Sequence, residues 1–380
     1  MNKKEVFTAA CVVAGNGMGS GMMAIPYFVA HAGIAGGITA FILAYIVSVL
    51  MHLMIAELLI QTDDTKDITG VFNRYLFTGK GGKVLRLLFF LILVTVLIAN
   101  LAAYISGAVE IITQLVPISP ALTRLVFYVI ASLVVILGLK TMCVSEVSAV
   151  SIMSVLLILA LLFSFSHINP GFAVSMTGSA GACTALFSMI MFSFSAIFAV
   201  PQVIDYLDRD TVKIRRSVFM GILINLVLSV TVAVCALITS EEVTKIAIVG
   251  WSEAAGGVIK ILGSLIIVLA MLTSYWSIGL ASSDIISNQT GAGEGLSFSL
   301  ATFPALVITF IAGSGFMDYL KIVGGAVAVI LSFMVIPSYL KCMKNADNSK
   351  IMKDKESKIP VTVFVFLMYI AMAVGSVISV

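Results

Sequence analysis

Long apolar stretches follow one another along almost the whole chain, separated by short polar or Gly/Pro-rich segments. A bilayer core about 30 Å thick takes roughly 20 apolar residues per helical crossing. In lipid each crossing must satisfy its own backbone groups, which a helix does. The pattern therefore predicts an all-α membrane protein with about eleven transmembrane helices, at 5–33, 34–61, 84–116, 121–140, 144–166, 179–208, 211–239, 255–288, 296–315, 318–341 and 359–379.

The positive charges are distributed unevenly between the connecting segments. If the amino terminus is cytoplasmic, the segments on that side contain all but four of the 22 Lys and Arg residues, the exceptions being Arg124, Lys245, Lys260 and Lys321. An excess of Lys and Arg in cytoplasmic loops sets the orientation of membrane proteins. We therefore expect a multi-pass cell-membrane protein with a cytoplasmic amino terminus and an extracellular carboxyl terminus.

Composition excludes several other classes of protein. Of the 380 residues, 60% are hydrophobic and 11% charged, whereas soluble domains carry roughly 25% charged residues. The net charge of +3 is small and lies in loops, so lipid is the expected surrounding and nucleic acid is not an expected partner. The five cysteines form no CxxC pair and predict neither a zinc site nor a disulfide framework. The sequence does not indicate an oligomeric state.

The two halves of the chain match when the first is shifted by about 175 residues. The span 34–61 then falls on 209–236, and 121–140 falls on 296–315. Because each half has five crossings, the second must enter the membrane from the opposite face, which predicts a 5+5 inverted repeat. Its parts are residues 1–167, residues 179–342, and a cytoplasmic linker with one extra C-terminal helix at 343–380. An accidental match between helices of similar length is the alternative.

Two of the crossings carry helix-breaking sequences at equivalent positions. Residues 15–21 contain four glycines at mid-membrane, and each glycine disfavours a helix by about 1 kcal/mol relative to alanine. Ala24-Ile25-Pro26 follows, and the same shift leads to Ala199-Val200-Pro201, which is preceded by residues 192–196. We therefore predict that the first and sixth helices are discontinuous.

Two such breaks at one depth suit the binding of a zwitterion. Unwound backbone in a membrane is tolerated where it is buried in protein or lines a wet cavity. The amides of Gly19, Ser20 and Gly21 would bind a carboxylate at the positive end of the next half-helix. The carbonyls near residues 192–194 would bind an ammonium group. An amino acid is the substrate that carries both, whereas a helix-packing face at Gly17 and Gly21 is the alternative reading of the glycines.

A pair of hydroxyl side chains, Thr273 and Ser274, lies in the middle of the otherwise apolar eighth span. Hard cations prefer oxygen ligands, so these hydroxyls and nearby helix-end carbonyls would form a weak Na⁺ site. Alternatively, each hydroxyl bonds to a carbonyl of its own helix.

At this point the chain resembles a known group of transporters. Ala14-Gly15-Asn16 and residues 19–26 resemble the first helix of the amino acid/auxin permease and hydroxy/aromatic amino acid permease families. These families belong to the amino acid, polyamine and organocation superfamily, which shares the five-plus-five inverted fold of the bacterial leucine transporter. The resemblance covers the whole chain in span count and repeat.

The resemblance implies a site for each ligand. The Na⁺ ligands it implies are Gly15, Met18, Ala270, Thr273 and Ser274, with Asn16 beside them. It places the substrate carboxylate on Gly19 to Gly21 and the side chain near the third span. The substrate-binding residues are then Gly19, Ser20, Gly21, Phe192, Ser193, Phe194, Ser195, Asn100 and Tyr104.

The absence of a lysine within the fifth span bears on which ion is coupled to transport. Certain proton-coupled relatives place a lysine on the fifth helix instead of sodium, and here no lysine follows Lys140 in that span. This favours Na⁺, while proton coupling and exchange are the alternatives. Glu57, Glu110, Glu146 and Asp284 fall near predicted span ends, where we expect them to snorkel or to form gates, Asp284 pairing with Lys3 or Lys4. The deeper His52 is either a packing residue or a proton carrier.

Other function classes lack their motifs. The chain has no HExxH, P-loop or GxSxG sequence, which disfavours an enzyme or an ATP-driven pump, and no carbonyl-filter repeat typical of a channel. A receptor that binds an amino acid without transporting it is the remaining rival. Phe192, Phe194 and Phe198 favour a neutral substrate, bulky or aromatic. The sequence thus predicts an importer that couples a neutral amino acid to Na⁺ and needs no organic cofactor.

Overall fold

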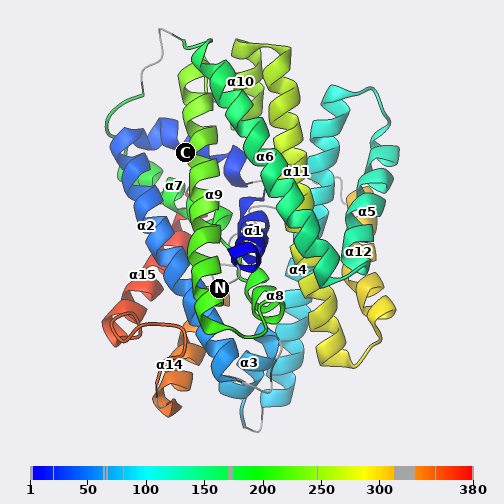
Figure 1. Ribbon diagram of the computed structural model, residues 1–380, viewed down its shortest axis with the longest axis vertical. Coiled ribbons are helices and arrows are strands. Elements are labelled where there is room, and N and C mark those ends of the chain that lie inside the picture. The colour runs from blue at the N-terminus through cyan, green and yellow to red at the C-terminus, as the bar shows by residue number, and fades with distance from the viewer. Residues whose placement is uncertain are drawn as a thin grey trace.

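The computed structural model of the chain is a bundle of helices, and its described part contains no strand (Figure 1). The residues that the structure describes are 3–19, 21–62, 65, 67–79, 81–169, 174–245, 247–311, 330–346 and 348–378.

The first two predicted crossings are built from two α-helices and a short 3₁₀ turn. Helix α1 (Lys3–Met18) is followed by η1 (Gly21–Met23) and α2 (Ile25–Gln61). Within α2 the helix is interrupted at Gly33, whose φ is +77°. A β-carbon there would lie 2.9 Å from the carbonyl oxygen of Ser175, so only glycine fits. This kink separates the predicted spans 5–33 and 34–61.

The remaining elements continue the pattern of long apolar helices. They are α3 (Ile68–Tyr75), α4 (Gly82–Leu115), α5 (Pro120–Ile136), α6 (Leu139–Phe165), α7 (Ala180–Ser193), α8 (Ala199–Tyr206), α9 (Thr211–Thr239), α10 (Ala247–Ala255), α11 (Gly257–Thr290), α12 (Glu294–Ile311), the π-helical turn η2 (Leu331–Val335), α14 (Ile336–Asn345) and α15 (Ile359–Gly375).

Six of these helices are long and apolar enough to cross a membrane, namely α2, α4, α6, α9, α11 and α12. Helices α5, α7 and α15 are apolar but shorter. The prediction of an all-α, multi-pass membrane protein is therefore confirmed, while the count of eleven crossings stays a prediction. The predicted span 318–341 lies for the most part outside the described residues.

Polar side chains determine where several helices begin. Ser119, Ser179 and Asp210 accept hydrogen bonds from backbone amides in the first turns of α5, α7 and α9. Such N-caps satisfy donors that would otherwise have no partner. Each cap lies where a polar segment meets an apolar run, which is why the sequence placed these starts within a few residues.

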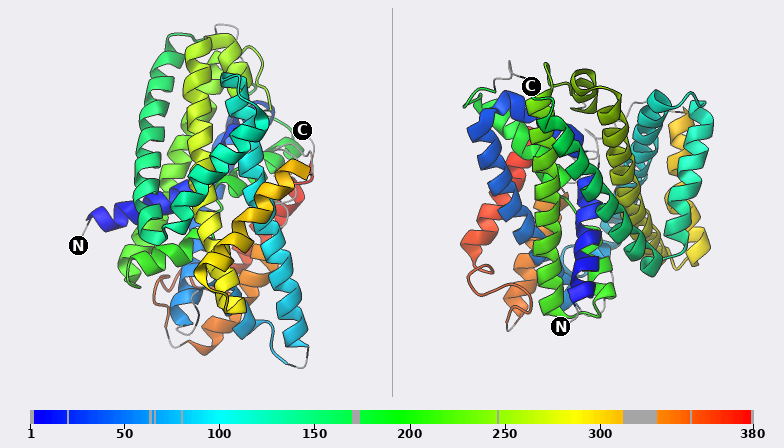
Figure 2. Two further views of the ribbon diagram at one scale, coloured as in Figure 1. Left: turned by 90° about the vertical axis from the view of Figure 1, so that its right-hand side faces the viewer. Right: turned by 45° about the horizontal axis from the view of Figure 1, so that its top comes forward.

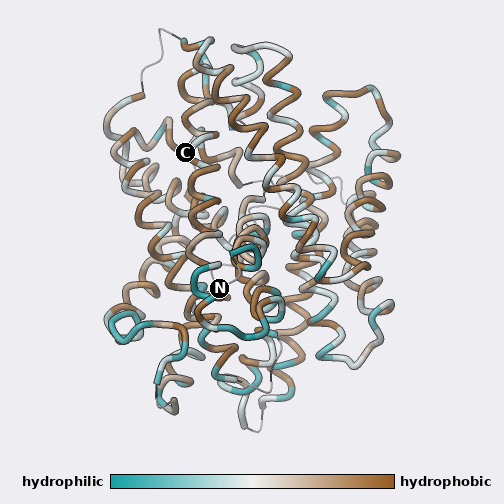
Figure 3. The backbone as a smooth tube through the Cα atoms, viewed as in Figure 1, coloured by the Kyte–Doolittle hydropathy of each residue, from teal (hydrophilic) through white to brown (hydrophobic). Residues whose placement is uncertain are grey.

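Most of the described residues of the two broken segments are buried, and Figure 2 shows α1, in dark blue, running from the edge of the bundle into its interior. Helix α1 packs along α9 and α2 packs along α7, while α11 crosses α4, α6 and α12. Large apolar side chains such as Leu87, Val129 and Leu162 are exposed on the outer helices. Figure 3 shows this apolar exterior in brown. Exposed apolar surface of this extent fits lipid rather than water.

Two contacts join residues that are 174 positions apart. The Tyr45 hydroxyl donates to the Phe219 carbonyl at 3.5 Å, and the Tyr128 and Thr302 hydroxyls are 3.1 Å apart. Residues equivalent under a two-fold relation touch one another only near its axis. The 5+5 inverted repeat itself stays a prediction.

Several charged segments gather at one face of the bundle. Lys213 lies 2.8 Å from Glu5, and Arg215 makes two hydrogen bonds of 2.7 Å to Glu356. The start of α1, the start of α9 and the linker before α15 therefore meet at this face, where Figure 3 shows hydrophilic residues around the amino terminus. All three segments were predicted to be cytoplasmic. The sidedness itself stays a prediction.

Candidate substrate and cation site

The first helix break lies where the glycine-rich sequence predicted it. Helix α1 ends at Met18, and Gly19 has a φ of +30°, a backbone conformation that favours glycine. The Gly19 amide does not continue the helix but donates to the Ser274 hydroxyl of α11 at 3.1 Å. Ser20, a predicted carboxylate ligand, lies outside the described residues, and Gly21 begins the short turn η1.

The second break separates α7 from α8, between Ser193 and Ala199. It lies against the first. A β-carbon placed on Gly17 would be 3.0 Å from the Ser193 carbonyl oxygen, and one placed on Gly21 would be 3.3 Å from the Phe192 ring. The predicted binding segments of the first and sixth spans are therefore in contact.

Side chains from unbroken helices hold the second break in place. Asn225 of α9 donates to the Ser193 carbonyl at 2.8 Å, and the Ala196 amide donates to His52 Nε2 of α2 at 2.8 Å. His52 Nδ1 lies 2.6 Å from the Ser48 carbonyl. Since one ring nitrogen accepts and the other donates, His52 is neutral. It serves as a fully buried support for the break.

The carbonyls at the end of α7 already have donors. The Phe192 carbonyl accepts from the Ser195 amide at 3.1 Å, and the Ser193 carbonyl accepts from Asn225. The sequence predicted these carbonyls to be open to an ammonium group.

The predicted cation ligands come together between α1 and α11. The Gly15 carbonyl accepts from the Thr273 hydroxyl at 3.0 Å and from the Ser274 hydroxyl at 3.1 Å. Thr273 also donates to the Ala270 carbonyl at 2.9 Å. Met18 is buried at the end of α1. Such a set of neutral oxygens suits a hard monovalent cation.

A small enclosed cavity of about 20 Å³ lies at the junction of the two breaks. That volume holds a water molecule but not an amino acid. The side chains of Asn16, Asn100 and Ser193 at or beside it contain buried polar atoms without a hydrogen-bond partner. Its lining residues are Asn16, Gly17, Gly19, Gly21, Asn100, Tyr104, Phe192, Ser195, Phe198 and Ile278. The two third-span residues proposed from the resemblance, Asn100 and Tyr104, thus lie in its wall.

This geometry agrees with the comparison against known families, in which the tryptophan/tyrosine permease family matches residues 2–376. The chain belongs to that family. Glutamine transporter 2 of Aliivibrio fischeri (strain ATCC 700601 / ES114) is 26% identical over 356 residues, which cover 87% of each protein. The tyrosine-specific transport system 1 of Haemophilus influenzae (strain ATCC 51907 / DSM 11121 / KW20 / Rd) is 26% identical over 339 residues, which cover 80% of each.

A solved structure has a similar fold. Mhp1, a nucleobase-cation-symport-1 family transporter in a closed conformation with bromovinylhydantoin bound, has a TM-score of 0.66 to the permease at 11% identity. The match covers 98% of this chain and 90% of that one. The predicted membership of the amino acid, polyamine and organocation superfamily is confirmed, and so is the prediction of an amino acid transporter rather than an enzyme.

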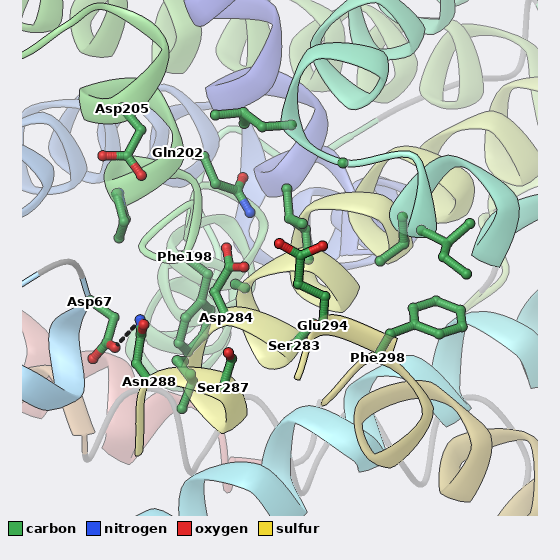
Figure 4. Close-up of a pocket in the computed structure, with 18 of the residues that line it drawn as sticks. Asp67, Phe198, Gln202, Asp205, Ser283, Asp284, Ser287, Asn288, Glu294 and Phe298 are labelled. Carbon is green, nitrogen blue, oxygen red and sulfur yellow. Dashed lines mark hydrogen bonds between the residues drawn. The ribbon is translucent and has the colours of Figure 1, made fainter. Parts of the chain in front are cut away.

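A second, larger cavity of about 560 Å³ lies in the permease between α8, α11 and α12. Figure 4 shows Asp284 and Glu294 among the side chains that line it, and Asn288 hydrogen-bonded to Asp67 at 2.7 Å. Phe198 lines both this cavity and the small one. The Phe198 ring therefore lies between the helix breaks and the larger cavity.

Two of the predicted span-end carboxylates are in fact deeply buried. Glu57 is fully buried in α2 and accepts hydrogen bonds from the backbone amides of residues 350–352, so it anchors the linker before α15. Glu146 is fully buried in α6, and neither of its carboxylate oxygens has a hydrogen-bond partner. The expectation that these two residues snorkel is wrong, because neither side chain reaches solvent. Asp284 lines the large cavity.

Sequence reasoning missed Asn225, and it missed the positions that His52 and Glu146 have at the site. Asn225 had no motif around it, and its polar side chain within an apolar span was the available signal. His52 was noticed, but its partner in the sixth span was not. Glu146 was assigned to a span end because the predicted span began at residue 144, whereas α6 begins at Leu139.

Proposed function

We propose that the permease is a secondary active transporter that imports a neutral amino acid, bulky or aromatic, by alternating access coupled to Na⁺. The observation that carries this proposal is the meeting of two helix breaks at one enclosed cavity with unpaired polar atoms around it. Buried polar groups without partners are costly unless a ligand or water satisfies them.

The cavity offers complementary groups to the two ends of a zwitterion. The Gly19 amide lies at the amino-terminal side of η1 and α2, where the backbone dipole favours an anion. A substrate carboxylate would replace the Ser274 hydroxyl as the acceptor of this amide. The C-terminal end of α7 favours a cation because of the helix dipole. Ser193 at this end would bind the substrate ammonium group, while Asn225 holds the Ser193 carbonyl in place.

The remaining wall supports a neutral side chain. Tyr104, Phe192, Phe198 and Ile278 surround the cavity with aromatic and apolar surface, and its lining contains no charged side chain. A charged substrate would lose its hydration there without gaining a counter-ion. The two relatives are named for glutamine and tyrosine, which are both neutral amino acids.

The cation would bind beside the substrate. The Thr273 and Ser274 hydroxyls point at the Gly15 carbonyl. If both hydroxyls rotated, their lone pairs would face the same point as that carbonyl and would coordinate Na⁺. Because Ser274 also accepts from the Gly19 amide, ion binding would influence the backbone that receives the carboxylate. Cation and substrate binding would then be coupled through one side chain.

Alternating access would use the larger cavity as one of two exits. The residues that line that cavity include Asp67, Glu294 and Phe198. Displacement of the Phe198 ring, or of α8 that follows it, would connect the cavity to the helix breaks. Asp67 directly precedes α3 in a segment predicted to be cytoplasmic, so this exit would release the substrate into the cell.

Reconstituted proteoliposomes test the whole proposal. Uptake of a panel of radiolabelled amino acids is measured with an inward Na⁺ gradient, with choline in place of Na⁺, and with a pH gradient alone. We expect saturable uptake of neutral amino acids that depends on the Na⁺ gradient. Uptake that follows only the pH gradient would replace Na⁺ by a proton, and binding without uptake would make the protein a receptor.

The cation ligands are tested by Thr273→Val, which removes a hydroxyl at nearly constant shape. We expect the Na⁺ concentration for half-maximal uptake to rise at least tenfold while substrate affinity at saturating Na⁺ changes little. Ser282→Ala is the matched control, because Ser282 is also buried in α11 but bonds only to its own helix, at Ile278. Equal Na⁺ dependence in both variants would remove Thr273 from the ion site.

A further inference from the structure

The most unusual charged group of the described chain is Glu146. It lies two turns into α6, is fully buried, and both of its carboxylate oxygens lack a hydrogen-bond partner. Glu57, the other fully buried glutamate of the described residues, accepts hydrogen bonds from three backbone amides, which is a usual way to stabilise a buried carboxylate. An ionised carboxylate in an apolar interior is strongly disfavoured unless a cation or several donors compensate it. The position of Glu146 therefore needs a different explanation.

The carboxylate of Glu146 lies directly against the cation ligands of α1 and α11. A β-carbon placed on Gly15 would be 1.9 Å from Glu146 Oε2 and 3.1 Å from the Thr273 β-carbon. The carboxylate therefore occupies the space that any side chain at position 15 would need. This explains why residue 15 is glycine although it lies within regular α1 helix, before the break.

The other groups around Glu146 do not neutralise it. Its titratable electrostatic neighbours are the thiols of Cys11 on α1 and Cys143 on α6. The helices packed against α6 are α1, α5, α8, α9 and α11, and among their described residues no Lys, Arg or His forms an ion pair with this carboxylate. On α11, the residue facing the same point is Thr273, which is uncharged. A mobile cation is the compensating charge that the site can still accept.

Resting on the proposed Na⁺ coupling, we propose that the Glu146 carboxylate is the anionic ligand of the cation site. Carbonyl and hydroxyl oxygens coordinate Na⁺ but leave its charge uncompensated in a low-dielectric interior. A carboxylate next to Gly15 and Thr273 supplies the missing negative charge. Ion binding then pairs the carboxylate with the cation between α6, α1 and α11.

Purified protein tests this role without any transport measurement. Radiolabelled Na⁺ binding and the Na⁺-induced rise in Tm, with choline holding the ionic strength constant, are measured for wild type, Glu146→Gln and Glu146→Asp. We expect Glu146→Gln, which has the same shape without the charge, to be at least as heat-stable as wild type without Na⁺. Its half-saturating Na⁺ concentration should rise tenfold or more. Glu146→Asp keeps the charge one methylene further away and should fall between the two.

Glu294→Gln is the control, because it removes one carboxylate from the exposed wall of the large cavity and leaves the ion site intact. It should bind Na⁺ as wild type does. Unchanged Na⁺ binding in Glu146→Gln would overturn the role of Glu146 while leaving the proposed Na⁺ coupling in place. Absence of Na⁺ binding in wild type would overturn the proposed coupling itself, and the ligand role with it.

Discussion

Gly17 near the end of α1 packs against the end of α7, and a single methyl group tests this contact. Gly17→Ala would place a β-carbon 2.7 Å from Asn225 Nδ2 and 3.0 Å from the Ser193 carbonyl oxygen. Ordinary contacts of a carbon atom are about 3.5 Å or longer. The end of α7 and the Asn225 side chain would therefore have to retreat by roughly 0.5–1 Å.

The energetic cost of Gly17→Ala follows from three terms. Overpacking costs about 1–3 kcal/mol, and loss of the hydrogen bond from Asn225 to Ser193 costs about 1 kcal/mol. The higher helix propensity of alanine offsets about 1 kcal/mol of this. The net loss is about 1–3 kcal/mol, so the folded protein should survive. Its binding segments would nevertheless be displaced, and misplacement by about 1 Å reduces the function of a preorganised site by up to about 100-fold.

The assay compares Tm with substrate affinity in detergent and uptake in proteoliposomes. We expect Gly17→Ala to lower Tm by a few degrees and to reduce uptake at least tenfold. Gly295→Ala is the control, since that glycine lies in the first turn of α12 with nothing within 4 Å of the added carbon. It should leave uptake unchanged and should not lower Tm, because the added methyl group meets no other atom and alanine favours the helix. Wild-type Tm and uptake in Gly17→Ala would refute the close contact between the breaks.

Three further changes test the supports around the site. Glu57→Ala leaves three backbone amides of the linker without an acceptor and should destabilise the protein by about 3 kcal/mol or more, as a fall in Tm. His52→Phe removes the acceptor of the buried Ala196 amide, so uptake should fall and Tm should drop by an amount equivalent to about 1–3 kcal/mol. The hydrogen bonds from Arg215 hold the pKa of Glu356 below its ordinary value of 4.5. The ion pair therefore stabilises the fold above pH 4.5 and is lost as the pH falls through the lower folded-state pKa, so the Tm difference between wild type and Glu356→Gln should shrink over that range.

Most of the fold could be predicted from the sequence, because a helix that crosses lipid requires a long apolar run. The lengths of the apolar runs predicted the long helices, and the polar segments between the runs predicted several helix starts, where the structure has N-caps such as Ser119 and Ser179. The kink at Gly33 came out as a boundary between two predicted spans. The short helices α3 and α10 were not predicted, because they are much shorter than the apolar run that a membrane crossing requires.

Only part of the site could be predicted from the sequence. Residue types reveal where a helix is interrupted, but not which residues of other helices contact the interruption. The glycines of residues 15–21 cannot support a regular helix, so their break was visible along one stretch of sequence. The assignment of Glu146 to a span end failed for a related reason. Distance from a helix end along the chain says nothing about the neighbouring helices, and here α1 and α11 cover a residue that lies two turns from the start of α6.

The side chains that bind the backbone of the two breaks come from other helices, so a single sequence does not show which break each of them contacts. Three backbone groups at the breaks are held by side chains of other helices: Gly19 by Ser274 of α11, Ala196 by His52 of α2, and Ser193 by Asn225 of α9. A buried polar group without a partner costs about 1–3 kcal/mol, so a discontinuous helix in lipid requires polar residues in other spans. The useful question for such a chain is therefore which isolated polar residue of an apolar span satisfies which break. In this permease Asn225 and His52 bind backbone groups of the break in the sixth span, and Ser274 binds a backbone group of the break in the first.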